Sequence, residues 1–139
     1  MTGLRSLSVG PLVLLSVATL SCGSGRQLQS VKINPPAATS QAQFTAAGTF
    51  SQPPSPVTLT SKDVTWCVGE LTNAPNADPT ACVGFVAPFA TVDQNGLAQC
   101  NPTQHGTGYI VAGASQVFSM NPDGGSQFKV SGSATLSCP

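Results

Sequence analysis

The sequence predicts an all-β protein, folded as an antiparallel β-sandwich of about seven short strands. Three observations support this fold class. Apolar and polar residues alternate along several short segments, and clusters of Gly, Pro, Asn and Asp separate those segments. No segment of helical length repeats its apolar residues every three to four positions.

The first half of the chain contains three predicted strands. Residues 30–34 alternate and stop at a pair of prolines, and residues 42–46 resume the alternation after a short gap. Three prolines between residues 48 and 56 predict a turn region, because proline cannot serve a central strand. Residues 63–68 form the next strand, which places Trp66 on its apolar face.

An irregular loop is predicted over residues 69–80, where Pro, Asn and Asp replace the alternation. The apolar segment 85–92, broken by a proline, leads to Asp-Gln-Asn-Gly at 93–96, a tight turn because Asn-Gly tolerates positive φ. Residues 97–100 form a short strand. Residues 106–113 are apolar on both faces, which predicts a central strand.

The last part of the chain has the longest alternation. A short strand over 117–120 leads to a turn over 121–125. From residue 128 to residue 138, each even position is apolar or small and each odd position is polar. This pattern predicts a long half-buried strand, with a β-bulge near Gly132.

The N-terminal segment predicts export. Arg5 precedes a short apolar run over residues 10–20, which is too short to span a bilayer and is typical of a secretory signal. The predicted organisation is a signal peptide over 1–21, a tether over 22–29 and one domain over 30–139.

Residues 18–22, Ala-Thr-Leu-Ser-Cys, resemble the lipobox of bacterial lipoproteins, although Thr19 replaces the usual aliphatic residue. The resemblance implies that Cys22 is lipidated and becomes the mature N-terminus. We therefore expect a lipid-anchored protein of the bacterial cell envelope or outer surface, held at the membrane through this anchor.

Charged residues are few, with five Lys and Arg, five Asp and Glu, and one His. The formal net charge is zero, so the chain lacks the basic footprint of a nucleic-acid-binding protein and a basic stripe for anionic lipid. No motif predicts a cofactor or a metal site.

Four cysteines lie in the predicted domain, at Cys67, Cys82, Cys100 and Cys138. Their even number, the lack of a CxxC motif and the single histidine favour two disulfides over a zinc site. Three pairings are open. We favour Cys67–Cys82, because Cys67 lies on the face opposite Trp66 and Cys82 follows the irregular loop. Cys100–Cys138 is then the second pair.

Five motifs stand in an order that resembles a known family. They are the opening strand at 30–35, the Gly- and Phe-containing strand at 44–50, the tryptophan strand at 63–66, the hairpin at 90–97 and the Gly-Thr strand at 106–112. Together they resemble the group 2 bacterial immunoglobulin-like domain. The resemblance implies an immunoglobulin-like sandwich of a surface or exported protein, with no catalytic residues. The long segment 68–88 and the four cysteines depart from the family pattern.

Three features are candidates for catalysis, metal binding or ligand binding. His105, the only histidine, lies in a predicted loop, and as a general base it would need an orienting acid and a nucleophile nearby. The sequence has no GxSxG motif and too many serines to single one out, which favours a solvated histidine over a general base. The tetrad at 93–96 has oxygen-bearing side chains at alternate positions, as at the start of a calcium-binding loop. A tight turn at Asn-Gly explains these residues better. Trp66 could stack on a sugar, but its neighbours Val64 and Val68 favour a core position.

Two functions remain open. The first is a non-catalytic module for surface interaction or envelope scaffolding, which binds an unknown envelope protein or polysaccharide. The alternative is an exported carbohydrate-active or hydrolytic accessory protein, which would need paired acids or an aromatic strip. The predicted contact surface is the loop at 69–79, with Leu71, Asn73 and Asn76 as candidate binding residues. If the Cys67–Cys82 bridge only keeps this loop from fraying, the loop is structural.

Overall fold

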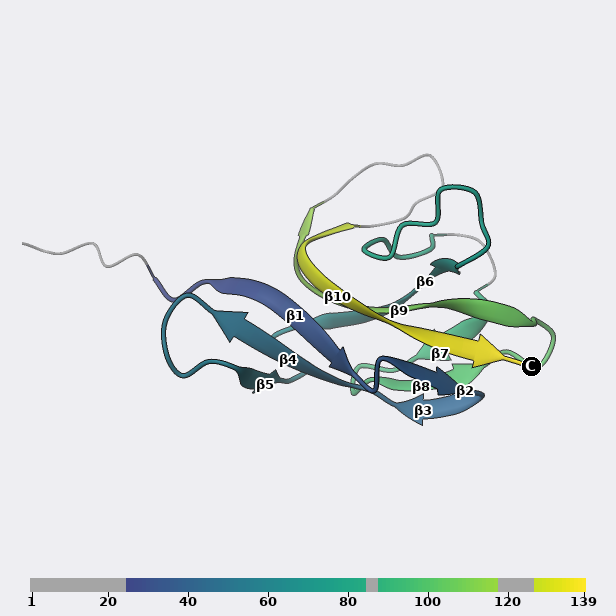
Figure 1. Ribbon diagram of the computed structural model, residues 1–139, viewed down its shortest axis with the longest axis horizontal. Coiled ribbons are helices and arrows are strands. Elements are labelled where there is room, and N and C mark those ends of the chain that lie inside the picture. Colours follow the sequence, from purple (N-terminus) through teal and green to yellow (C-terminus); the bar gives the residue numbers. More distant parts are fainter. Residues whose placement is uncertain (1–24, 85–87, 118–126) are drawn as a thin grey trace, which may run out of the picture.

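A computed structural model describes residues 25–84, 88–117 and 127–139. The predicted signal peptide, Cys22 and the start of the tether lie outside these residues. The described chain has ten strands and no helix, and it is an immunoglobulin-like β-sandwich (Figure 1). The strands are β1 Leu28–Asn34, β2 Ala37–Thr39, β3 Gln41–Gln43, β4 Thr45–Phe50, β5 Val57–Leu59, β6 Thr65–Leu71, β7 Ala90–Val92, β8 Leu97–Cys100, β9 Gly106–Val117 and β10 Gln127–Cys138.

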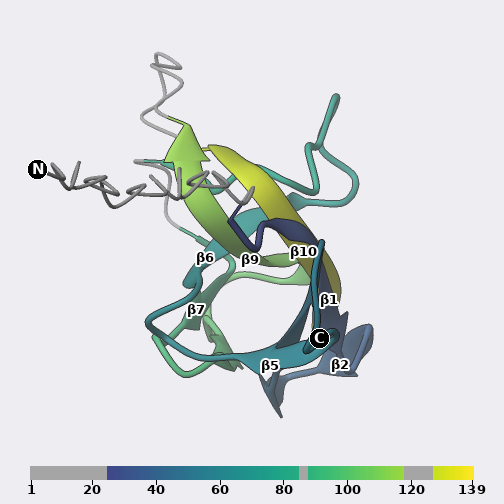
Figure 2. The same ribbon diagram turned by 90° about the vertical axis from the view of Figure 1, so that its left-hand side faces the viewer.

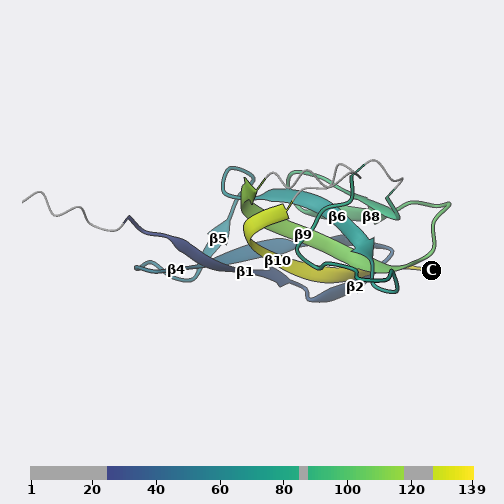
Figure 3. The same ribbon diagram turned by 90° about the horizontal axis from the view of Figure 1, so that it is seen from above.

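The strands form two layers. The sheets β1-β4-β5 and β3-β8-β7 make one layer, because β3 and β4 are successive parts of one extended segment. The sheet β2-β10-β9-β6 makes the other layer, and its long strands β9 and β10 run along the molecule in Figure 3. Seen end-on in Figure 2, the strands surround a common interior.

The chain changes layers at the proline pair after β1. β1 pairs antiparallel with β4, whereas β2 pairs parallel with β10 in the opposite sheet. Proline has no N–H to donate to a ladder, so the pairing of β1 ends there. The carbonyl of Pro36 instead accepts a hydrogen bond from the backbone N–H of Thr135, at 3.0 Å, and so begins the new pairing.

The described residues form ten strands, whereas about seven were expected, because several strands are too short to be predicted from an alternation. The strand predicted over 42–46 is divided into β3 and β4 at Phe44, whose N–H donates to the carbonyl of Gly96 instead of a neighbouring strand. β2 and β5 have three residues each, too few for an alternation to show. β4 also continues to Phe50, into the segment expected to be a turn region.

The 93–96 turn and the central position of β9 are both confirmed. The N–H of Gly96 donates to the carbonyl of Asp93, and Gly96 has φ +84°. β9 lies between β6 and β10. It extends to Val117, the first residue of the strand expected over 117–120; the rest of that strand and the predicted 121–125 turn lie outside the described residues.

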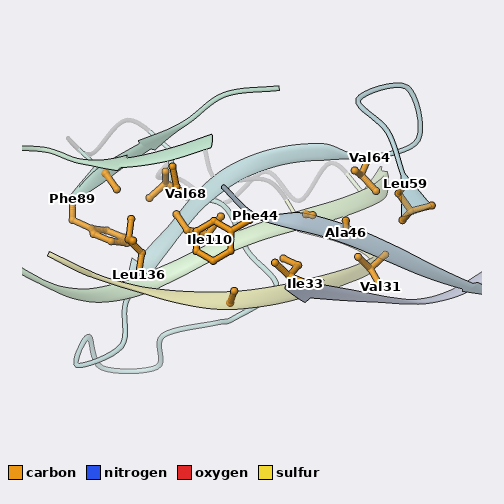
Figure 4. Packing of buried hydrophobic residues seen from close by; sticks show 14 of the residues in the cluster. Val31, Ile33, Phe44, Ala46, Leu59, Val64, Val68, Phe89, Ile110 and Leu136 are labelled. Atoms are coloured by element: carbon orange, nitrogen blue, oxygen red, sulfur yellow. The ribbon is translucent and has the colours of Figure 1, made fainter. Parts of the chain in front are cut away.

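Both faces of β9 are buried, which explains its apolar sequence. Ile110 and Ala112 are fully buried in the main core between the layers (Figure 4). Val111, between them, is fully buried on the other face, in a smaller cluster with Cys82 and Phe128. Both faces of the sheet β2-β10-β9-β6 are therefore covered. The opposite layer covers one face, and the segment around Cys82 covers the other.

The bulge expected in the last strand is absent. β10 pairs with β9 in one unbroken register through Gly132, so there is no bulge. The glycine is instead required by contact with β1, since a Cβ there would overlap the backbone of Val31. Phe128 also lies in the smaller cluster, whereas Ala134 and Leu136 lie in the main core. Strict alternation along the sequence therefore does not keep all the apolar side chains in one core.

Candidate functional site

The predicted contact loop follows β6 and has a defined conformation. β6 ends at Leu71, so the loop begins at Thr72 rather than at residue 69. The disulfide Cys67–Cys82 joins β6 to the end of the loop, with 5.6 Å between the two Cα atoms. Cys67 packs in the smaller cluster on the face away from the main core, as its position in the alternation predicted. We call residues 72–83 the strap.

Backbone hydrogen bonds fix both ends of the strap. At its start, the N–H and the hydroxyl of Thr72 donate to the carbonyl of Thr107, at 2.8 and 3.0 Å. At its end, the N–H of Val83 donates to the carbonyl of Val68, at 2.8 Å. The strap is thus tied to β9 at its start and to β6 at its end.

Asp78 fixes the middle of the strap. Its Oδ1 accepts hydrogen bonds from the N–H and hydroxyl of Thr80, at 2.7 and 2.6 Å, and its Oδ2 accepts one from Nε2 of Gln127, at 3.0 Å. Ala81 also forms an isolated bridge with Gln127. The hydrogen bonds from Thr80 hold the pKa of Asp78 below its ordinary value, since they favour the charged carboxylate.

The three candidate binding residues of the loop differ in placement. Asn73 and Asn76 are exposed, and Asn76 has φ 64°, a left-handed conformation that asparagine tolerates at turns. Leu71 belongs to β6, pairs with Gly108 and packs against the main core. Leu71 therefore anchors the start of the strap to the main core. The exposed surface of the strap consists of the residues that follow Leu71.

The second disulfide, Cys100–Cys138, joins β8 in one layer to β10 in the other, with 5.5 Å between the Cα atoms. Cys138 is 3% exposed and belongs to the main core. Both favoured pairings are thus present in the structure. This bridge fixes one layer against the other at the end of β10.

Trp66 is partly buried and packs against the main core. One edge of its indole lies over Gly96 of the 93–96 turn. The same ring lines a hollow of about 180 Å³ at the start of β6. Trp66 thus combines a core contact with a surface that opens to the outside.

The remaining candidates take local structural roles. Nδ1 of the exposed His105 forms a hydrogen bond with the carbonyl oxygen of Pro139. Oδ1 of Asp93 accepts the backbone N–H groups of Asn95 and Leu97, each at 2.8 Å, as a turn residue does. Across residues 25–84, 88–117 and 127–139, no three His, Cys, Asp or Glu side chains gather where they could hold a metal ion.

A hollow of about 250 Å³ beside the strap was not predicted. Glu70, Leu71, Val83 and Phe89 contribute to its lining. Its residues come from segments far apart in sequence, so no local pattern could have indicated it. Among the described residues, no helix is long and apolar enough to cross a membrane.

No protein-family model matches the chain, and no curated protein is significantly similar to it.

Proposed function

We propose that this chain is an exported, lipid-anchored, non-catalytic immunoglobulin-like module of the bacterial cell envelope. It binds another envelope component, a protein or a polysaccharide, through the strap. The observation that carries the proposal is the strap itself, an exposed polar loop whose start, middle and end are each fixed to the sandwich.

Two disulfides support the exported location. Such bonds form and persist in oxidising compartments, and they are rare where thiols are kept reduced. The fifth cysteine, Cys22, follows the apolar run of the predicted signal, and lipidation accounts for its lack of a partner in the cysteine count.

A fixed loop is well suited to binding. An ordered loop loses less conformational entropy when a partner binds than a flexible loop does, so more of the contact energy appears as affinity. Loops held on a rigid frame are also where sandwiches concentrate their binding residues. The exposed side chains of Asn73 and Asn76 can each donate and accept hydrogen bonds at this surface.

The acids support a non-catalytic role over the hydrolytic alternative. A glycosidase needs two carboxyl groups that converge on one bond. Asp63, Asp78 and Asp93 belong to three different loops, and each accepts hydrogen bonds from its own loop. Glu70 lines the hollow beside the strap, and no second acid is found among the described residues of that lining.

The anchor is tested with the full chain expressed in a bacterial host that is fed a labelled fatty acid. We expect label on the wild-type protein and its recovery with membranes. The variant Cys22→Ser should lose both. If label and membrane fraction are unchanged in the variant, the anchor is wrong.

The strap is tested with a photo-crosslinking amino acid placed at residue 73 or residue 76 of the full chain. After illumination of whole cells, we expect a discrete adduct from each position. Gln99, exposed on β8, is the matched control and should give none. No adduct from the strap, or the same adduct from residue 99, would contradict the proposed contact surface.

A further inference from the structure

The hollow beside Trp66 lies at the opposite end of β6 from the strap. Residues from β4, from the segment 58–61 and from the 93–96 turn complete its wall. Three of the apolar residues in this wall, Phe44, Ala46 and Leu59, are buried in the core. The indole of Trp66 is therefore the main aromatic surface that a ligand could touch.

The indole N–H of Trp66 has no partner within the described chain. It makes no hydrogen bond with any other described residue, and no buried side-chain polar atom in this part of the chain lacks a partner. It follows that this N–H is not buried. An aromatic ring with an accessible donor at its edge offers an apolar face and a polar contact together.

The rim of the hollow is polar and uncharged. Thr58, Ser61, Gln94 and Asn95 are exposed, and their side-chain hydroxyl and amide groups form no hydrogen bond within the described residues. Each of these groups can both donate and accept a hydrogen bond. None of the described residues that line the hollow is ionisable, so it suits a ligand without charge.

The turn on one side of the hollow is held in place. Nε2 of Gln43 donates to the carbonyl of Asn95, at 2.6 Å, and the carboxylate of Asp93 accepts the N–H of Asn95. Gly96 lets this turn approach the indole closely, because a Cβ there would lie 2.9 Å from Cζ2 of Trp66. The amides of Gln94 and Asn95 are thus presented beside the ring.

The segment on the other side is held as well. Oδ2 of Asp63 accepts hydrogen bonds from the N–H and the hydroxyl of Thr60, each at 2.8 Å. This contact fixes the turn that carries Ser61. A ligand that enters the hollow therefore meets donors and acceptors that are already ordered.

From this geometry we propose that the hollow binds one sugar unit of a neutral carbohydrate chain. A pyranose ring has a face of C–H groups, which suits the indole, and a rim of hydroxyls, which suits the amide and hydroxyl groups around it. The volume of about 180 Å³ is smaller than the roughly 300–1,000 Å³ of pockets that enclose drug-sized ligands, so one unit fits and the rest of the chain stays outside. This site is separate from the strap and does not depend on it.

Trp66 is the only tryptophan of the chain, so its fluorescence reports directly on the hollow. The full chain with both disulfides intact is titrated with maltotriose, cellotriose and chitotriose. Trigalacturonate and the peptide Gly-Ser-Gly-Ser are the charged and the peptide comparisons. We expect a saturable change in emission with at least one neutral trisaccharide, and none with the two comparison ligands.

Variants locate the binding. The double variant Gln94→Ala/Asn95→Ala changes exposed residues only and should weaken the affinity at least tenfold, while Gln99→Ala should leave it unchanged. Trp66→Phe, measured by calorimetry, should also bind more weakly, and its circular dichroism reports on folding. The inference is wrong if no neutral trisaccharide saturates, if the double variant binds as well as the wild type, or if trigalacturonate or the peptide binds equally. Loss of the strap adducts would leave this result unaffected.

Discussion

The backbone of Val31 in β1 lies directly against the Cα atom of Gly132 in β10, with no room for a side chain between them. Through this contact β1, which pairs with β4 in one layer, also packs on the opposite sheet. The glycine is required by packing, since no positive φ is found at this position.

We predict that Gly132→Ala destabilises the fold by about 1–3 kcal/mol, the usual cost of an added methyl group in a packed site. The measurement is urea unfolding of the oxidised protein, compared with the wild type. Gly25→Ala is the control, because a Cβ at residue 25 would meet no atom within 4 Å. Equal unfolding midpoints for Gly132→Ala and the wild type would contradict the packing account.

The reason for Gly132 could not be found from the sequence. Within β10 the alternation predicted the strand, and a glycine in a strand is commonly a bulge. The contact with Val31 joins residues a hundred positions apart, so no local pattern contains it. The central strand β9 could be predicted, because a strand that is buried on both faces has apolar residues at successive positions. That pattern is visible in the sequence of the strand itself.

The features of the candidate sites also divide into those that a local sequence pattern indicates and those that depend on distant contacts. Cys67–Cys82 could be predicted because the alternation placed Cys67 on the outer face. Leu71 was assigned to the loop because proline and asparagine follow it closely, but pairing with β9 extends β6 to include it. The hollow beside Trp66 depends on β4, the segment 58–61 and the 93–96 turn meeting β6 in space, which only the fold reveals.

The two disulfides should stabilise the protein unequally. Their sequence separations are 15 for Cys67–Cys82 and 38 for Cys100–Cys138, which in the chain-entropy model correspond to about 3 and about 4 kcal/mol. Replacing Cys100 and Cys138 with Ala should therefore lower the free energy of unfolding more than replacing Cys67 and Cys82. Urea unfolding without reductant compares the two variants, and the reverse order would contradict this prediction.

Asp78 predicts a dependence of stability on pH. Its folded-state pKa is lowered from the ordinary 3.8, so its carboxylate contributes stability above that value, which is lost as the pH falls through the folded pKa. The variant Asp78→Asn should cost no more than about 1 kcal/mol at pH 7, because the group is near the surface.

The difference between this variant and the wild type should then shrink as the pH falls from 3.8 through the lowered folded-state pKa, where the wild-type carboxylate also becomes neutral. Thermal unfolding from pH 7 to pH 2 measures it. Asp63, whose pKa is lowered by the hydrogen bonds from Thr60, should behave in the same way in the variant Asp63→Asn. A difference that stays constant over this range would contradict the assignment.

Leu71 and Asn73 are two residues apart but should respond differently to truncation. Leu71 packs against the core but is only partly buried, so Leu71→Ala should cost about 1–3 kcal/mol, below the full cost for a completely buried leucine. Asn73 is exposed and should change stability by less than about 0.5 kcal/mol when replaced with Ala. Thermal unfolding tests both, and similar losses would mean that the strap is packed more tightly than described.

The pairing of β1 with β4 also has a mechanical consequence. It extends from Leu28↔Phe50 to Asn34↔Thr45, and the two strands lie side by side in the left part of Figure 1. A force applied between residue 25 and the strap would load these hydrogen bonds in shear, so they would have to break together rather than peel apart one after another. A module held at its N-terminal end and pulled by a bound partner would therefore carry that tension across the hydrogen bonds between β1 and β4.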